Sequence, residues 1–162
     1  MTFSILLSAF VGALLWLDRV YLFQSMVSRP IILAPILGFV MGDVKAGLLV
    51  GSALELLWLN APPVGAYLPE DETFCAAVAA PVAVTAAAFM NDAAAAGLAL
   101  VLTLPFARTG KWLDTKIRTL NQDLSPEAVD DIERAVGRAL SKAVIRSYLF
   151  ALVLILVSSV PL

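Results

Sequence analysis

Residues 38–59 read GFVMGDVKAGLLVGSALELLWL, an apolar run that is interrupted by glycines and charged residues. Two GxxxG pairs occur in it, Gly38 with Gly42 and Gly47 with Gly51. Glycines at this spacing leave a bare stripe on a helix, against which the backbone of a neighbouring helix can pack closely in lipid. The two pairs therefore predict close helix packing.

Asp43 and Lys45 stand between the two glycine pairs and predict a turn between two helical pieces, residues 31–42 and 46–59. Each piece is shorter than the roughly 20 apolar residues that a straight transmembrane helix needs, and together they are too long for one crossing. Such pieces indicate re-entrant or broken helices, which occur at membrane depth where they are buried in protein or line a cavity. We expect Asp43 and Lys45 to stabilise the break, paired with each other or with Arg29.

The composition places the chain in the membrane class. Hydrophobic residues make up 60% and charged residues 15% of it, and the mean hydropathy is +0.90, whereas soluble domains average about 45–50% apolar and about 25% charged residues. Histidine is absent and Cys75 is the single cysteine, so common general bases, metal motifs and disulfides are excluded. We expect no metal, no cofactor, no nucleic acid and no enzymatic activity of this chain by itself.

The distribution of charge predicts three parts of an all-α integral membrane protein, a bundle of transmembrane and re-entrant or broken helices. Residues 1–106 form a membrane domain with re-entrant helices, whose first segment we read as retained rather than as a cleaved signal. Residues 107–146 carry eight of the 11 basic residues and form a cytoplasmic amphipathic helical segment by the positive-inside rule. Residues 147–162 form a C-terminal transmembrane helix.

Within the cytoplasmic segment, Ser125 and Pro126 predict a helix start. An apolar stripe follows at three- and four-residue spacing: Val129, Ile132, Val136, Leu140 and Ala143. We expect the stripe to pack on the rest of the protein, and docking of a cytoplasmic partner is the alternative. Earlier in the chain, Asn91 and Asp92 split an alanine-rich region into either a hairpin or a broken helix.

Glu55 has no cation near it in sequence, and a lone carboxylate at the bilayer centre costs at least about 2.5–3.5 kcal/mol. We expect it to face a cavity that binds a solute, or else a partner on another helix. The Pro- and Gly-rich stretch 60–74 follows, with Asn60 and the acidic run 70–72. Carboxylate and amide oxygens accept hydrogen bonds from sugar hydroxyls, although a solvated loop is equally compatible with this stretch. Trp58 or Tyr67 can supply an apolar face for a sugar ring or lie at the membrane interface.

Residues 28–78 resemble the membrane-embedded IIC component of the mannose/fructose/sorbose family of the bacterial phosphoenolpyruvate-dependent sugar phosphotransferase system (PTS). The matching residues are Arg29-Pro30, Gly38, Gly42-Asp43, Lys45, Gly47, Gly51, Glu55 and Asp71, preceded by Asp18 and Gln24. The similarity continues more loosely to about residue 150. Family members are usually longer, so the resemblance implies a C-terminally short chain.

The resemblance implies a sugar permease subunit in the bacterial cytoplasmic membrane, which is crossed several times. Sugar, of the hexose or amino sugar class, is phosphorylated as it is released, by phosphohistidines on separate IIA and IIB domains, and a IID membrane subunit completes a hetero-oligomer. Glu55 and Asp71 become the leading sugar contacts, and Asn60 is a weaker third. Arg29, Asp43, Lys45 and Asp18 become structural polar residues.

Two other functions fit the same residues. The first is a non-transporting scaffold or regulatory subunit that docks IID or IIB. The second is a small proton- or cation-coupled transporter that uses Glu55 and Asp43. Dependence of uptake on phosphoenolpyruvate rather than on an ion gradient distinguishes the permease from this second alternative.

Overall fold

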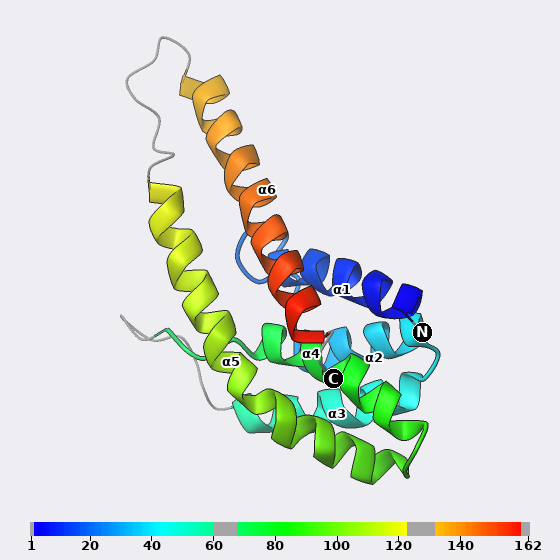
Figure 1. The fold of residues 1–162 in the computed structure, drawn as a ribbon. Coiled ribbons are helices and arrows are strands. Elements are labelled where there is room, and N and C mark those ends of the chain that lie inside the picture. The colour runs from blue at the N-terminus through cyan, green and yellow to red at the C-terminus, as the bar shows by residue number, and fades with distance from the viewer. Residues whose placement is uncertain (1, 60–67, 123–131, 160–162) are drawn as a thin grey trace.

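A computed structural model describes residues 2–59, 68–122 and 132–159, which form six α-helices and, within these ranges, no strand (Figure 1). The helices are α1 Thr2–Leu17, α2 Pro30–Met41, α3 Val44–Trp58, α4 Glu72–Ala87, α5 Asp92–Gln122 and α6 Ile132–Ser159. The predicted all-α fold is therefore confirmed.

The interrupted stretch around Asp43 folds as a helical hairpin of α2 and α3. These helices have 12 and 15 residues, which makes them about 18 and 22 Å long, less than the roughly 30 Å of a hydrocarbon core. Gly42 follows α2 in the left-handed conformation, with φ of 97°, which glycine adopts without steric cost. Asp43 then caps α3 by accepting a hydrogen bond from the Ala46 N–H at 3.0 Å. The predicted turn therefore lies at Gly42–Asp43.

Three glycines allow α2 and α3 to pack backbone against backbone. A Cβ atom on Gly47 or on Gly51 would lie 2.5 Å from a backbone carbonyl oxygen of α2. A Cβ atom on Gly38 would lie 3.2 Å from the Cα of Gly47. Gly42 takes no part in this contact, because a Cβ there would meet nothing within 4 Å. The expectation that Gly42 belongs to a packing pair is therefore wrong, and its place is explained by its positive φ.

Helices α4 and α5 form a second, antiparallel hairpin, with α4 at the centre of the fold. The turn at Asn91 begins α5, and the Asn91 side chain accepts a hydrogen bond from the Ala94 N–H at 2.8 Å. At the other end, the Asp71 N–H donates to the Ala107 carbonyl at 3.0 Å. Helix α4 packs against each of the other five described helices, and its first two turns are buried. Of the two readings of the alanine-rich region, the hairpin is the one found.

Helices α5 and α6 are the long elements of the described chain, with 31 and 28 residues. Residues 92–122 and 136–158 are long and apolar enough to cross a membrane. Helix α5 changes direction near its middle, where Pro105 lies inside the helix, and its second half leans away from α1–α4, as does the beginning of α6, whereas the end of α6 lies beside α1 (Figure 1). Proline in a helix removes a backbone hydrogen bond and causes such bends.

The polar block 107–146 is built into these two long helices. The proposed boundaries at 106/107 and at 146/147 both fall inside continuous helices, so the described part of the polar block lies in the end of α5 and the beginning of α6. Ser125, Pro126 and Val129 lie outside the described residues. The assignment of the block to the cytoplasmic side stays a prediction.

The apolar stripe on α6 is not buried as we expected. Val136 is 50% exposed and Leu140 is 57% exposed, while Ala143 is partly buried. The 3.6-residue periodicity indicated an apolar face, but it did not indicate what covers that face. Packing of Val136 and Leu140 on the rest of this chain is therefore a wrong prediction.

The close contact of α2 with α3 yields a test of the hairpin. We expect Gly47→Ala to destabilise the protein by about 1–3 kcal/mol, the usual cost of overpacking, because its Cβ would meet a backbone atom that cannot move aside. Gly97→Ala is the matched control, because a Cβ there meets nothing within 4 Å and alanine favours a helix by roughly 0.5–1 kcal/mol. Thermal unfolding in detergent measures both. Equal melting temperatures of the two variants would contradict the described packing.

Candidate functional site

Two arginines and three carboxyl groups meet at one end of the α2–α4 helices. Helices α2 and α4 begin at this end and α3 finishes there, so Arg29, Glu55 and the first residues of α4 come together. Arg19, from the segment after α1, reaches the same place. We call Arg19, Arg29, Glu55, Asp71 and Glu72 the charged cluster.

Asp71 is the most enclosed member of the charged cluster, with 0% of its surface exposed. One carboxylate oxygen accepts a hydrogen bond from the Trp16 indole N–H at 2.7 Å. The other accepts one from the Phe74 N–H at 2.9 Å, which caps α4, and lies 2.8 Å from Nη1 of Arg19. A negative charge at a helix N-terminus is also favoured by the helix dipole. Asp71 therefore joins α1, its following segment and α4.

Gly110 of α5 provides the room for this arrangement. A Cβ atom on Gly110 would lie 2.5 Å from the Cβ of Asp71 and 2.6 Å from the Cβ of Phe74. Helix α5 thus lies directly against the first turn of α4. Any larger residue at position 110 would displace the buried carboxylate.

Arg29 connects the ends of three helices. It precedes α2, and its guanidinium pairs with Glu55 of α3 and, at 2.9 Å, with Glu72 of α4. The Ile31 N–H also donates to Glu55 at the long distance of 3.4 Å. Glu55 is therefore mostly buried, at 12% side-chain exposure, and paired across helices. This is the alternative that the sequence left open for Glu55, a partner supplied by another helix.

Asp43 and Lys45 lie at the opposite end of the hairpin and do not pair with Arg29 in the structure. Asp43 caps α3, while Lys45 forms an ion pair with Asp92, the first residue of α5, at 2.7 Å. The Lys45 side chain is 76% exposed, and exposed pairs contribute little to stability. The expected pairing of Asp43 or Lys45 with Arg29 is therefore wrong, because α3 holds them about 15 Å or more from Glu55 along its axis.

Asp18 organises the segment between α1 and α2. Its carboxylate accepts hydrogen bonds from the Ser25 N–H and hydroxyl at 3.1 and 3.0 Å and from the Val27 N–H at 3.1 Å. Burial tends to raise the pKa of Asp18, but these bonds and one from the Ser28 N–H outweigh it and hold the pKa below its ordinary value of 3.8. The stabilisation is therefore present at neutral pH and is lost as the pH falls through that lowered pKa.

Some of the predicted site residues lie elsewhere or outside the described chain. Asn60 and Tyr67 belong to residues 60–67, which the structure does not describe. Trp58 packs against the hydrophobic core. The tryptophan that reaches an acidic residue is Trp16, which the sequence reasoning missed together with Arg19. The sequence Trp-Leu-Asp-Arg at residues 16–19, where polar groups end the first apolar segment, could have indicated that Trp16 and Arg19 have polar partners.

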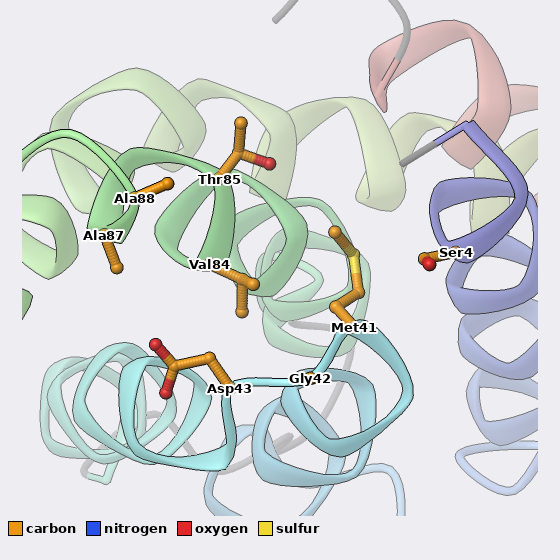
Figure 2. Close-up of a pocket in the computed structure, with 8 residues that line it drawn as sticks. All are labelled: Ser4, Met41, Gly42, Asp43, Val84, Thr85, Ala87 and Ala88. Atoms are coloured by element: carbon orange, nitrogen blue, oxygen red, sulfur yellow. The ribbon is translucent and has the colours of Figure 1, made fainter.

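A hollow with a volume of about 430 Å³ lies at the other end of the helices, away from the charged cluster (Figure 2). Ser4, Met41, Asp43, Val84 and Thr85 are among the residues that line it. Its polar groups are largely used locally, because the Thr85 hydroxyl donates to a carbonyl of its own helix at 2.8 Å and the Asp43 carboxylate caps α3. This hollow offers little that would direct a polar ligand. Among the described residues, no group of three His, Cys, Asp or Glu side chains could hold a metal.

An all-helical chain with two helices of membrane-spanning length and broad apolar exposure on α1, α5 and α6 is an integral membrane protein. The family model for the "PTS system sorbose-specific IIC component" matches residues 2–162. The chain therefore belongs to this family of IIC components, the membrane components of sugar phosphotransferase systems.

Curated relatives carry names of the same kind. The chain is 30% identical over 73 residues to a putative N-acetylgalactosamine permease IIC component 2 of Escherichia coli K12, covering 44% of this chain and 55% of the relative. It is 30% identical over 106 residues to the mannose-specific EIIC component of the same strain, covering 64% of this chain and 38% of the relative. The sorbose-specific EIIC component of Klebsiella pneumoniae is 30% identical over 92 residues, which cover 57% of this chain and 32% of the relative.

Solved structures share the fold. A cryo-EM structure of the mannose transporter ManYZ in complex with microcin E492 contains a chain that matches 99% of this one with a TM-score of 0.81 and 21% identity. This chain spans 63% of that chain. A structure described as a membrane protein matches 99% of this chain and 64% of its own, with a TM-score of 0.80 and 20% identity. The chain thus spans about a third to two thirds of the length of these relatives.

The hydrogen bond from Trp16 to Asp71 provides a test of the site. We expect Trp16→Phe to destabilise the protein by about 1.5–3 kcal/mol, the range for hydrogen bonds to charged groups, because it removes a donor from a fully buried carboxylate. Trp112→Phe is the control, since Trp112 is 57% exposed. Thermal unfolding in detergent reports both. A loss in Trp112→Phe as large as that in Trp16→Phe would argue against the described contact.

Proposed function

We propose that this chain is a permease subunit that binds a sugar at the charged cluster and moves it across the bacterial cytoplasmic membrane. The observation that supports the proposal is the meeting of Glu55, Asp71 and Glu72 with two arginines in a chain of the IIC family. Asp71 is fully buried and the other four side chains are partly buried, in a chain that is 60% hydrophobic. Charged side chains at such positions usually mark a solute path.

The chemistry of the charged cluster suits a neutral polyol. A sugar hydroxyl both donates and accepts hydrogen bonds, and carboxylates accept while guanidinium groups only donate. A hydroxyl inserted between Arg29 and Glu55 satisfies both members of that pair. Glu55 is assigned as the first sugar contact because its side chain retains some exposure, whereas Asp71 is enclosed. Asn60 stays a candidate outside the described residues.

We further propose that transport is coupled to phosphorylation by partner subunits. The chain has no histidine, so it carries no phosphohistidine, and the phosphate comes from IIA and IIB while a IID subunit completes the membrane complex. The basic ends of α5 and α6 face the cytoplasm under the positive-inside rule, where such carriers dock. The sugar is a hexose or an amino sugar, and the membrane is crossed several times.

One observation favours the second candidate function, a scaffold that docks IID or IIB without transport. Arg29 and Glu55 form a close pair that also holds Glu72, an arrangement that a purely structural clamp needs as well. In that case the carboxylates stabilise helix ends and touch no solute. The two functions differ in what a neutral isostere at position 55 does.

We expect Glu55→Gln to reduce sugar uptake by at least about tenfold, the effect of one lost charge-assisted hydrogen bond. The variants are introduced into the natural host, so that every partner is present, and uptake of labelled mannose, sorbose, fructose and N-acetylgalactosamine is measured. The amount of the chain in the membrane is quantified in parallel. Asp92→Asn is the matched control, the same carboxylate-to-amide change at a partly exposed residue whose partner is the exposed Lys45.

Exchange of the two charges separates a clamp from a binding site. In a Glu72→Gln background, which removes the second carboxylate that pairs with Arg29, Arg29→Glu combined with Glu55→Arg preserves an ion pair between positions 29 and 55 but moves the carboxylate to the residue before α2. Normal uptake in this combined variant, or in Glu55→Gln, would favour the scaffold. Lost uptake with normal membrane abundance in both supports the permease, and its dependence on phosphoenolpyruvate rather than on a proton gradient supports coupling to phosphorylation.

A further inference from the structure

Asp114 is a buried carboxylate that the charged cluster does not include. It lies on α5 with 1% exposure, and its Oδ1 accepts a hydrogen bond from Nε of Arg118 at 3.0 Å. Its other oxygen, Oδ2, is buried and has no hydrogen-bond partner. A buried acceptor that is left unpaired typically costs about 1–3 kcal/mol, and more when it is charged. Oδ2 of Asp114 is therefore a buried acceptor whose missing hydrogen bond costs folding free energy.

Arg19 contributes a positive charge beside Asp71. Its Nη1 lies 2.8 Å from Oδ1 of Asp71 and forms an ion pair with it, without a well-aligned hydrogen bond. The Arg19 side chain is only 18% exposed. Asp71 therefore already has a cationic partner, whereas Oδ2 of Asp114 has no partner of its own.

Helix α5, which carries Asp114, packs directly against Asp71 of the charged cluster. A Cβ on Gly110 would lie 3.0 Å from Asp71 Cγ. Asp114 follows Gly110 by four residues, so it lies on the same face of α5 about 6 Å further along the helix. This direction leads from the charged cluster toward the basic end of α5.

The charges around Asp114 determine which kind of ligand group can bind there. Arg19 and Arg118 disfavour a cation, and Asp71 and Asp114 disfavour a phosphate or another anion. A neutral hydroxyl donates a hydrogen bond to Oδ2 of Asp114 and brings no charge of its own. This complementarity distinguishes the place from the hollow near Asp43, whose polar groups largely have partners within their own helices.

We propose that Asp114 binds one hydroxyl of the transported sugar and is a specificity-determining residue of the transport path. The inference rests on the proposed function, because it assigns a further contact to the same solute. The sugar hydroxyl donates the hydrogen bond that Oδ2 of Asp114 lacks. A buried water molecule is the competing occupant, and it would give Asp114 a structural role only.

The variant Asp114→Asn tests the proposal with little change in shape. An amide has one acceptor oxygen, and Arg118 requires an acceptor, so the amide NH₂ group turns toward the sugar. The sugar hydroxyl then meets the amide NH₂ group, which only donates, and loses its acceptor. We expect the affinity for the sugar to fall about 10- to 100-fold, the loss for one hydrogen bond to a charged group.

Monodeoxy sugars identify the hydroxyl concerned. Equilibrium binding of the best-bound sugar among mannose, sorbose, fructose and N-acetylgalactosamine is measured on membrane vesicles from the host that expresses the full complex. Each monodeoxy analogue of that sugar is then tested against the wild type and Asp114→Asn. We expect one analogue to bind about 10- to 100-fold more weakly than the parent sugar to the wild type, and equally well to both proteins.

A control variant and melting temperatures distinguish sugar binding by Asp114 from a purely structural role. Asp92→Asn, the change at a partly exposed carboxylate of the same helix, should leave affinity unchanged. A lower melting temperature for Asp114→Asn with unchanged affinity assigns a water molecule and overturns the proposal, as does a parallel loss for every analogue. If Glu55→Gln weakens binding but Asp114→Asn does not, only this inference fails. If the wild type binds none of the four sugars, the proposed function fails and this inference fails with it.

Discussion

A charge that is buried among lipid-facing helices needs a partner of opposite sign, and this requirement shapes the centre of the protein. Arg29 pairs with carboxylates from α3 and α4, and Arg19 pairs with Asp71. Breaking a buried pair by removing one member usually costs several kcal/mol, whereas the intact pair contributes little net stability. The two arginines therefore fix which helix ends lie together more than they strengthen the fold.

The same pairs explain how stability and transport can share residues. Asp71 has an indole N–H, a backbone N–H and a guanidinium around it, and no exposed surface, which suits a group that holds three segments in place. Glu55 and Glu72 share one guanidinium and keep some exposure. In the proposed function, a solute hydroxyl enters this shared pair without leaving a charge unsatisfied. Asp71 then supports the proposed site, and the shared pair offers the proposed contact.

The short helices and the turn at Gly42–Asp43 followed from length, glycine spacing and capping, all of which are local properties of the chain. The partners of Glu55 and Asp71 did not follow, because Arg29 and Arg19 are distant in sequence and the hydrophobic pattern contains no information on which helix ends meet. The exposure of Val136 and Leu140 was missed for a related reason. Periodicity identifies an apolar face, but it does not distinguish a protein neighbour from another environment. Asn60 lies outside the described residues.

The glycine contact between α2 and α3 has a consequence for how the protein adapts to different solutes. Side chains can change rotamer at little cost, but a seam made of main-chain atoms in contact has no such freedom. The hairpin of α2 and α3, which follows Arg29 and carries Glu55, therefore behaves as one rigid unit with a fixed spacing between its two helices. In the proposed function, α2 and α3 therefore accommodate different solutes through their side chains and not through a change in the spacing between the two helices.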